Sequence, residues 1–248
     1  SLSKMSDFSL FIDPEKINAD IIKVEGEDFH YLKNVLRVAV GTEGELRDGS
    51  NKFYQVSVRD LKEKSLTLKI ERTTEEDTEL PVKITLAQAL PKSDKMELII
   101  QKSVELGVQE IIPLQTEHCV VKLTKDKAPN KVERWQKIAK AAALQSGRNI
   151  VPQIASVTAW QDLLNSFKNY DLVLLPWELE NQTSLKTILQ KGDFPGSRLS
   201  CLVIIGPEGG FSQNEMASAK EAGAKTITLG KRILRTETAG MAILAMLN

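Results

Sequence analysis

The amino-acid sequence predicts an α/β protein with two domains, a small β-rich domain at residues 1–73 and a larger α/β domain at residues 82–248. Residues 5–73 hold several short apolar or alternating runs and one segment of helical period. Residues 74–81 are polar and acidic and end in a proline, which is typical of a linker. From Val82 onward, short apolar runs alternate with helical segments, the order found in open, largely parallel sheets.

The first domain is expected to be a small barrel of short strands with a single helix. Strands are predicted at residues 8–12 and 21–24, and residues 65–70 alternate polar and apolar side chains. A hairpin is predicted to join residues 43–48 to residues 52–59 through a turn that contains Gly49. The helix is predicted at residues 28–38, because four apolar side chains there share one face: Phe29, Leu32, Val35 and Leu36.

The second domain is expected to alternate strands with helices. Apolar runs predict strands at residues 84–90, 111–114, 172–175, 202–205 and 225–229. Helices are predicted from residue 94 to Gly107, at residues 131–146, and at the end of the chain. Polar residues predict the helix starts: Asp94 with Glu97, Thr158, Ser184, Ser212 with Glu215, and Thr236.

Composition and charge set limits on the function. The 248 residues include 33 Lys or Arg and 33 Asp or Glu, so the net charge does not indicate a nucleic-acid partner, and any RNA contact needs patches formed by folding. No apolar run approaches the roughly 18 residues of a membrane helix, and no signal peptide is visible, so we expect no membrane association and a cytoplasmic location. The two cysteines, Cys119 and Cys201, predict neither a disulfide framework nor a metal site.

Two loops at strand ends carry the candidate chemistry. The first, Gly206-Pro207-Glu208-Gly209-Gly210, follows an apolar strand and precedes a helix start, a geometry that suits an anion or a cofactor. The same pattern also fits a tight turn with no ligand. The second loop follows the strand at 225–229 and contains three basic residues. Because strand ends of a parallel sheet meet at one edge, both loops are expected to form one site.

Two common nucleotide motifs are absent. No Gly-x-Gly-x-x-Gly follows a strand, so a standard dinucleotide site is not supported. Six residues separate Gly223 from Gly230-Lys231, where a P-loop has four, and Arg232 stands where that motif needs Ser or Thr.

Four ordered segments carry a resemblance to a known family. Residues 206–211 (GPEGGF) and 229–239 (LGKRILRTETA) closely resemble the RsmE family of SPOUT methyltransferases, as do residues 95–108 and 145–149. The resemblance implies transfer of a methyl group from S-adenosylmethionine to N3 of a uridine in the decoding region of 16S ribosomal RNA. It also implies a PUA-like N-terminal barrel, a trefoil-knotted SPOUT domain, a homodimer, and a substrate within the small ribosomal subunit.

The resemblance assigns the cofactor to three strand-end segments. Leu229, Ile233 and Leu234 would supply an apolar slot for adenine. The implied cofactor-binding residues are Leu175, Pro176, Trp177, Gly206, Pro207, Glu208, Gly209, Gly210, Leu229, Gly230, Ile233, Leu234 and Thr238.

Arg235 and Glu237 are the candidate catalytic residues. A guanidinium near uracil would stabilise the charge that develops as N3 loses its proton, with Arg235 as the first choice and Arg148 as the second. Glu237 is expected to accept the proton, to hold Arg235 in place, or only to complement the helix dipole. The proton acceptor stays unassigned.

The predicted RNA contacts are mostly basic. Lys33 and Arg37 lie four residues apart on the predicted helix, so they are expected to share a face that either binds RNA or is merely solvated. The full set is His30, Lys33, Arg37, Lys122, Arg148 and Arg235. The family pattern is not followed at His118, Leu144 and Lys231, where the family commonly has Arg, Glu and Pro. The alternative functions are methylation of another base or of ribose, and RNA binding without catalysis.

Overall fold

The structure, a computed structural model, describes residues 6–191 and 199–248 and divides into two units. The N-terminal unit runs to Glu79 and also includes Gly147–Val151, and the C-terminal unit comprises Leu80–Ser146 and Pro152–Asn248. The predicted linker at 74–81 therefore begins inside a strand, since β6 (Leu66–Glu75) extends five residues past the predicted strand end at residue 70. The return of residues 147–151 to the first unit was not predicted, because nothing in local sequence pattern reports so distant a contact.

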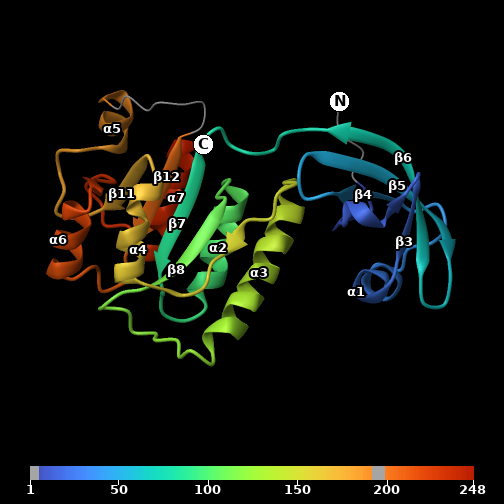
Figure 1. Ribbon diagram of the computed structural model, residues 1–248, viewed down its shortest axis with the longest axis horizontal. Coiled ribbons are helices and arrows are strands. Elements are labelled where there is room, and N and C mark those ends of the chain that lie inside the picture. The colour runs from blue at the N-terminus through green and yellow to red at the C-terminus, as the bar shows by residue number, and fades with distance from the viewer. Residues whose placement is uncertain (1–5, 192–198) are drawn as a thin grey trace. The chain divides into compact units, whose positions relative to one another are not determined.

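The N-terminal unit is built on a six-stranded sheet whose order is β1-β4-β5-β6-β3-β2 (Figure 1). β1 pairs with β4 in parallel, and all other neighbours are antiparallel. The remaining strands are β1 (Phe8–Phe11), β2 (Ile17–Asn18), β3 (Ile21–Val24), β4 (Glu43–Arg47) and β5 (Lys52–Leu61). The hairpin of β4 and β5 is confirmed. Alternate side chains of these strands form one apolar core with Phe29 and Leu32 of the helical segment.

The helical segment of this unit is shorter than predicted. It consists of α1 (Gly26–His30) and a π-helical turn, η2 (Tyr31–Val35), and it ends at Leu36. Arg37 follows with a φ of 54°, in the left-handed region that usually holds glycine after a helix end. Lys33 and Arg37 therefore do not share a helix face. The short elements η1 (Pro14–Lys16) and β2 were not predicted, because they are too short to show a period.

The C-terminal unit contains a seven-stranded sheet in which all pairs are parallel. Its order is β10-β8-β7-β12-β11-β13, and β9 also pairs with β8. The strands are β7 (Lys83–Ala89), β8 (Glu110–Gln115), β9 (Gln153–Ile154), β10 (Thr158–Ala159), β11 (Leu172–Pro176), β12 (Ser200–Ile205) and β13 (Lys225–Ile227). The predicted open parallel sheet is confirmed.

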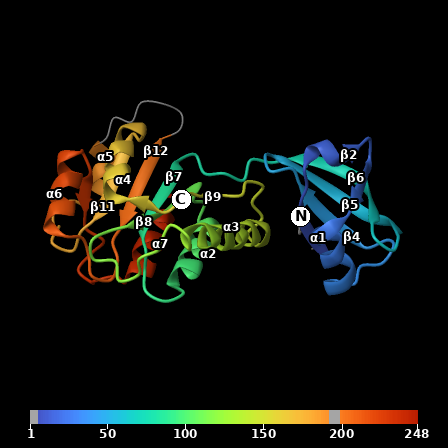
Figure 2. The same ribbon diagram turned by 60° about the horizontal axis from the view of Figure 1, so that its bottom comes forward.

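Helices cover both faces of this sheet (Figures 1 and 2). α2 (Lys95–Glu105), α3 (Ala128–Gln145) and α7 (Thr236–Leu247) lie on one side, and α4 (Trp160–Ser166) and α6 (Gln213–Glu221) lie on the other. α7 packs against α2, β7 and β12. A Cβ at Gly240 would lie 3.4 Å from Leu86, so α7 approaches β7 closely. The last helix thus returns from the edge strand β13 to the middle of the sheet.

The predicted helix starts are only partly correct. Ser212 and Glu215 form the predicted capping box at the start of α6, and Ser184 Oγ accepts a hydrogen bond from Thr187 N before α5 (Leu185–Lys191). Asp94 makes no side-chain cap, since Glu97 N donates to the backbone O of Asp94 at 3.1 Å, and the carboxylate of Glu97 pairs with Arg134 of α3. Thr158 lies in β10, and Thr236 is the first residue of α7 rather than its cap.

Within the described residues, no helix is long and apolar enough to cross a membrane, and no group of three or more His, Cys, Asp or Glu could hold a metal ion. Cys119 and Cys201 are both free and buried. Burial raises the pKa of the Cys201 thiol to about 12, so this thiol has little nucleophilic character.

Candidate functional site

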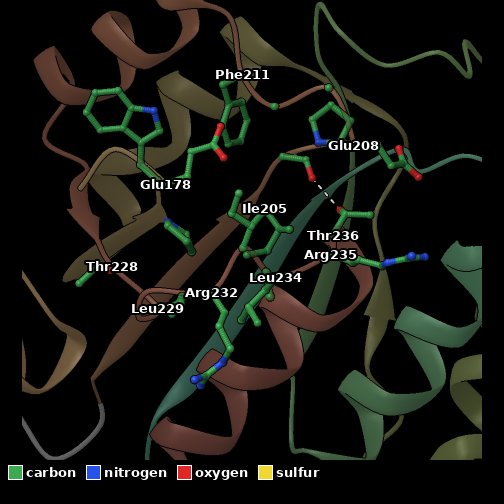
Figure 3. Close-up of a pocket in the computed structure, with 18 of the residues that line it drawn as sticks. Glu178, Ile205, Glu208, Phe211, Thr228, Leu229, Arg232, Leu234, Arg235 and Thr236 are labelled. Atoms are coloured by element: carbon green, nitrogen blue, oxygen red, sulfur yellow. Dashed lines mark hydrogen bonds between the residues drawn. The ribbon is translucent and has the colours of Figure 1, made fainter. Parts of the chain in front are cut away.

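A cavity of about 550 Å³ lies at the carboxyl edge of the C-terminal sheet, where β11, β12 and β13 end (Figure 3). The start of α2 and the start of α7 complete its wall. It is lined by Lys95, residues 176–178, residues 205–211, residues 228–236 and Ala239. The two glycine-containing loops therefore meet as the sheet topology predicts.

The first loop brings its backbone to the cavity wall. Gly210 has a φ of +68°, a conformation that a side chain would strain, and its N–H donates to Pro207 O at 2.9 Å. A Cβ at Gly209 would lie 3.2 Å from Cβ of His118, and one at Gly206 would lie 3.0 Å from the Phe211 ring. A side chain would strain the backbone at Gly210, and at Gly206 and Gly209 it would press on a neighbouring side chain.

Glu208 connects this turn to the start of α2 through a hydrogen bond and an ion pair. Its Oε1 accepts a hydrogen bond from Lys92 N at 3.0 Å and lies 3.5 Å from Nζ of Lys95. Partial burial opposes the charge, but backbone N–H donors at Glu208 and Lys92 and the ammonium of Lys95 together hold the pKa of the Glu208 carboxyl below its ordinary value. His118 supports the turn from another side, with Nδ1 3.1 Å from Gly209 O.

Thr236 links the turn to the last helix. Its hydroxyl donates to Gly206 O at 2.7 Å, which Figure 3 shows as a dashed line, and accepts from Gln88 Nε2 at 2.9 Å. Gln88 is fully buried near the end of β7. This chain of hydrogen bonds joins β7, the end of β12 and the first residue of α7.

Trp177 forms part of the opposite wall. Its backbone N–H donates to Ile227 O at 3.0 Å, which ties it to β13. The ammonium of Lys220 lies 4.1 Å from the centre of its ring, a cation–π contact. The indole is therefore held in place from α6 before any ligand binds.

The second loop is basic and largely exposed. Lys231, Arg232 and Arg235 are exposed, and Ile233 is 82% exposed. Figure 3 shows Leu234 near Ile205 in the middle of the cavity, whereas Arg232 and Arg235 point away from each other. Arg235 makes no ion pair with any residue that the structure describes. Its guanidinium is therefore available to a ligand.

Glu237 is engaged by a lysine rather than by Arg235. Its Oε2 lies 3.3 Å from Nζ of Lys95, and the side chain is 17% exposed. This oxygen is buried and accepts no hydrogen bond from any of the described residues. The geometry does not show Glu237 holding Arg235.

Most of the residues assigned to the cofactor from the sequence line this cavity. Leu175 and Thr238 do not: Leu175 is fully buried in the core beneath the sheet edge, and Thr238 is exposed on α7. The sequence reasoning did not select several lining residues for this site: Lys95, Ile205, Phe211, Thr228 and Ala239. Lys95 opens the helix of a segment already recognised as family-like, which was the available signal.

The predicted RNA contacts lie in different surroundings. His30 is exposed, with Nδ1 2.8 Å from Asn34 Nδ2, and Lys122 is exposed in the C-terminal unit. Lys33 is half-buried, since its ammonium donates to Glu63 O at 3.2 Å and lies over the Phe29 ring. Arg37 is exposed.

Arg148, in contrast, is buried and forms an ion pair within the N-terminal unit. It is 4% exposed, and its guanidinium pairs with Glu79, with Nε 3.1 Å from Oε2. Its carbonyl accepts a hydrogen bond from Arg47 at 3.0 Å. Because a buried, paired guanidinium is not offered to solvent, the structure contradicts the assignment of Arg148 to RNA or to the uracil anion.

Comparisons with known proteins agree with this geometry. A family model described as RNA methyltransferase domain matches residues 78–248, and one described as RNA methyltransferase PUA domain matches residues 24–71. The ribosomal RNA small subunit methyltransferase E of Bacillus subtilis is 35% identical over 237 residues, covering 93% of this chain and 90% of that protein. The protein of the same name from Synechocystis is 34% identical over 242 residues, which cover 97% of this chain and 77% of that protein.

A solved structure is also similar over almost the whole chain. The ribosomal RNA small subunit methyltransferase E of Neisseria gonorrhoeae, bound to S-adenosyl methionine, has a TM-score of 0.83 and 32% identity, covering 96% of this chain and 95% of that one. The chain belongs to the RNA methyltransferase family whose curated members carry the name ribosomal RNA small subunit methyltransferase E.

Proposed function

We propose that this protein transfers a methyl group from S-adenosylmethionine to N3 of a uridine in the decoding region of 16S ribosomal RNA. The observation that carries the proposal is the cavity at the sheet edge, whose glycine turn, apolar floor and free guanidinium suit both the cofactor and an acidic nucleobase.

The residues present fit the cofactor. The cavity volume of about 550 Å³ is in the range of sites for ligands of this size. Leu229, Ile233 and Leu234 offer apolar surface to an adenine ring, and at Gly206, Gly209 and Gly210 no side chain stands between a ligand and the backbone of the turn. When bound, S-adenosylmethionine supplies an activated methyl group on its sulfonium.

Arg235 is the residue that we place against the uracil. N3 becomes nucleophilic as its proton leaves, and negative charge spreads to the neighbouring carbonyl oxygens. An exposed guanidinium at the cavity wall stabilises that charge without first breaking an ion pair. Holding the base and the methyl donor in one cavity converts the transfer into an oriented, effectively unimolecular step.

Glu237 enters this mechanism as the partner of Lys95 rather than as the proton acceptor. Its carboxylate is largely buried and close to an ammonium, so it is not directed to a base in the cavity. The proton of N3 is not assigned to a protein group.

RNA capture is assigned to basic residues on both units: the exposed His30, Arg37, Lys122 and Arg235, and the half-buried Lys33. Lys33 contributes less than a free lysine, because it is tied to Glu63 O. Contacts of this kind release counterions, so the affinity for RNA should fall as salt increases.

The protein is expected to act as a homodimer on the small ribosomal subunit in the cytoplasm. Large apolar side chains stay exposed on two helices that pack together, Leu98 on α2 at 43% and Met246 on α7 at 52%. A second copy would cover them. Light scattering coupled to size exclusion measures the mass, and a monomer at micromolar concentration would contradict this part.

Methylation of small-subunit RNA tests the main proposal. RNA from a strain that lacks the enzyme is treated with protein and S-adenosylmethionine, and mass spectrometry locates the added methyl group. Methyl on N3 of one uridine is the expected result. Methyl on ribose or on another base would replace the assignment, and cofactor binding without any transfer would favour a non-catalytic RNA-binding protein.

Gly209→Val tests the cofactor site itself. The added side chain would meet His118 and displace the turn, so we expect cofactor binding by calorimetry to be lost while circular dichroism still shows a folded protein. Ala222→Val, which adds the same branched side chain at an exposed position after α6, is the matched control and should bind normally.

A further inference from the structure

A single ammonium group joins two carboxylates at the wall of the cavity. Lys95 is the first residue of α2, and its Nζ lies 3.5 Å from Oε1 of Glu208 and 3.3 Å from Oε2 of Glu237. Glu208 belongs to the glycine turn after β12, and Glu237 lies in the first turn of α7. Three segments far apart in the sequence thus meet at one charge.

We infer that Lys95 is a positioning residue of the cofactor cavity, which fixes the glycine turn against the start of α7 because its ammonium attracts Glu208 and Glu237 together. This inference rests on the assignment of the cavity to S-adenosylmethionine. It adds a residue that contributes through the two acidic side chains, without itself touching the methyl group or the base.

Partial burial strengthens the attraction between Lys95 and the two carboxylates. The side chains of Lys95, Glu208 and Glu237 are 30%, 24% and 17% exposed, so water only partly screens them. Glu208 has a second donor in Lys92 N, but the buried Oε2 of Glu237 has Lys95 as its ionic partner and accepts no hydrogen bond from the described residues. Without the ammonium, two carboxylates would repel each other at the place where the two loops must stay together.

Other charges line the same cavity but do not replace Lys95. Within the described residues, no second ion pair to Glu208 or Glu237 is found. The charged groups that share the cavity wall are Glu178, Lys231, Arg232 and Arg235. All four are exposed and therefore better screened.

Cofactor affinity in a double-mutant cycle tests the inference. Lys95→Met is expected to raise the Kd for S-adenosylmethionine by about 10-fold, because it leaves the two carboxylates unpaired. Glu237→Gln alone should have a smaller effect, because Lys95 keeps Glu208. The double variant should bind better than Lys95→Met, since the repulsion is removed. Independent, additive effects would overturn the inference.

The pH dependence supplies a readout that simple loss of packing would not change. In Lys95→Met, the two carboxylates repel each other, and uptake of a proton as the pH falls relieves this repulsion. The Kd of this variant should therefore move toward the wild-type value as the pH is lowered, and Glu237→Gln in the same background should abolish the trend. A flat profile in Lys95→Met would contradict the bridge.

Two controls separate the possible failures. Lys102→Met removes a lysine of the same helix that pairs only with Glu105 among the described residues, and it should bind the cofactor normally. If the wild type does not bind S-adenosylmethionine, the proposed function fails; if the wild type and Lys95→Met bind it equally well, only the role of Lys95 fails. Should Lys95→Met not fold, the Glu208→Gln and Glu237→Gln cycle keeps the lysine, and non-additive effects there support the bridge whereas additive ones overturn it.

Discussion

Arg235 is the single side chain on which the proposed methyl-transfer chemistry depends most. It precedes α7 and lines the cavity with a guanidinium that no described carboxylate pairs. Arg235→Ala should lower kcat by on the order of 100-fold, because an electrostatic donor to the developing uracil anion is lost. Arg235→Lys should restore little of it, since lysine lacks the planar fork. Single-turnover methylation at saturating RNA measures the effect.

The alternative for Arg235 is a contact to an RNA phosphate. Such a contact binds ground state and transition state equally, so its loss would raise KM and leave kcat unchanged. A wild-type single-turnover rate for Arg235→Ala at saturating RNA would remove this residue from the chemistry.

Arg37 allows stability to be separated from RNA binding. Its φ of 54° costs an L-amino acid about 1 kcal/mol, and glycine adopts this angle freely. Arg37→Gly should therefore keep or slightly raise the urea midpoint while it weakens RNA binding and flattens its salt dependence. Arg37→Ala loses the same charge but keeps the strain. An unchanged salt slope in both variants would show that Arg37 does not meet RNA.

At the scale of elements, the docking of α7 depends on one hydroxyl. Thr236→Val removes the donor to Gly206 O and the acceptor for Gln88 while preserving the shape. We expect a loss of about 1–3 kcal/mol in the free energy of unfolding, measured by urea denaturation, together with weaker cofactor binding. Thr236→Ser keeps both hydrogen bonds and should change stability by less than about 1 kcal/mol. Equal losses in the two variants would show that the methyl group, not the hydroxyl, matters.

Strands and glycine turns were predictable because their signals are local. The apolar run at β12, the capping box of Ser212 and the turn at 206–210 each depend on a few neighbouring residues. Helix starts were less predictable, because tertiary partners compete for the capping side chains. Glu97 pairs with Arg134 of another helix, and Thr236 hydrogen-bonds to Gly206, so neither serves the cap that its sequence context suggests.

In the candidate site, too, the features set by local sequence were predictable, and those set by distant partners were not. Loop positions followed from strand ends, and most of the residues predicted to bind the cofactor line the cavity. Lys95 was missed because its importance arises from two partners that lie 113 and 142 residues further along the chain. The burial of Arg148 was missed for the same reason.

At the scale of the whole molecule, Asn149 completes the N-terminal unit from a distant part of the chain. It is fully buried, its Oδ1 accepts from Gly49 N at 2.9 Å, and its Nδ2 donates to Lys52 O at 2.7 Å. Asn149→Ala should lower the free energy of unfolding of this unit by about 2–3 kcal/mol, since both backbone groups lose their partner. Amide hydrogen exchange in β4 and β5, recorded as denaturant is increased, measures this change in the free energy of unfolding. Asn18→Ala, at an exposed edge position, should be neutral, and a neutral Asn149→Ala would refute the role.

The trefoil knot implied by the resemblance stays a prediction. Strand order and the return of α7 from the sheet edge describe the path of the backbone, but pairing alone does not establish threading. No local sequence pattern encodes it either, since threading is a property of the complete chain.

The segment Gly147–Val151 has a consequence for how the protein is made. Synthesis proceeds from the N-terminus, so β1 to β6 leave the ribosome long before the asparagine that satisfies their hairpin turn. The N-terminal unit is therefore complete only after residues 80–146 of the other unit have been synthesised and Gly147–Val151 has followed. Nascent chains stalled before Gly147 should be cleaved by protease in β4 and β5, and chains that have released Val151 should be protected there.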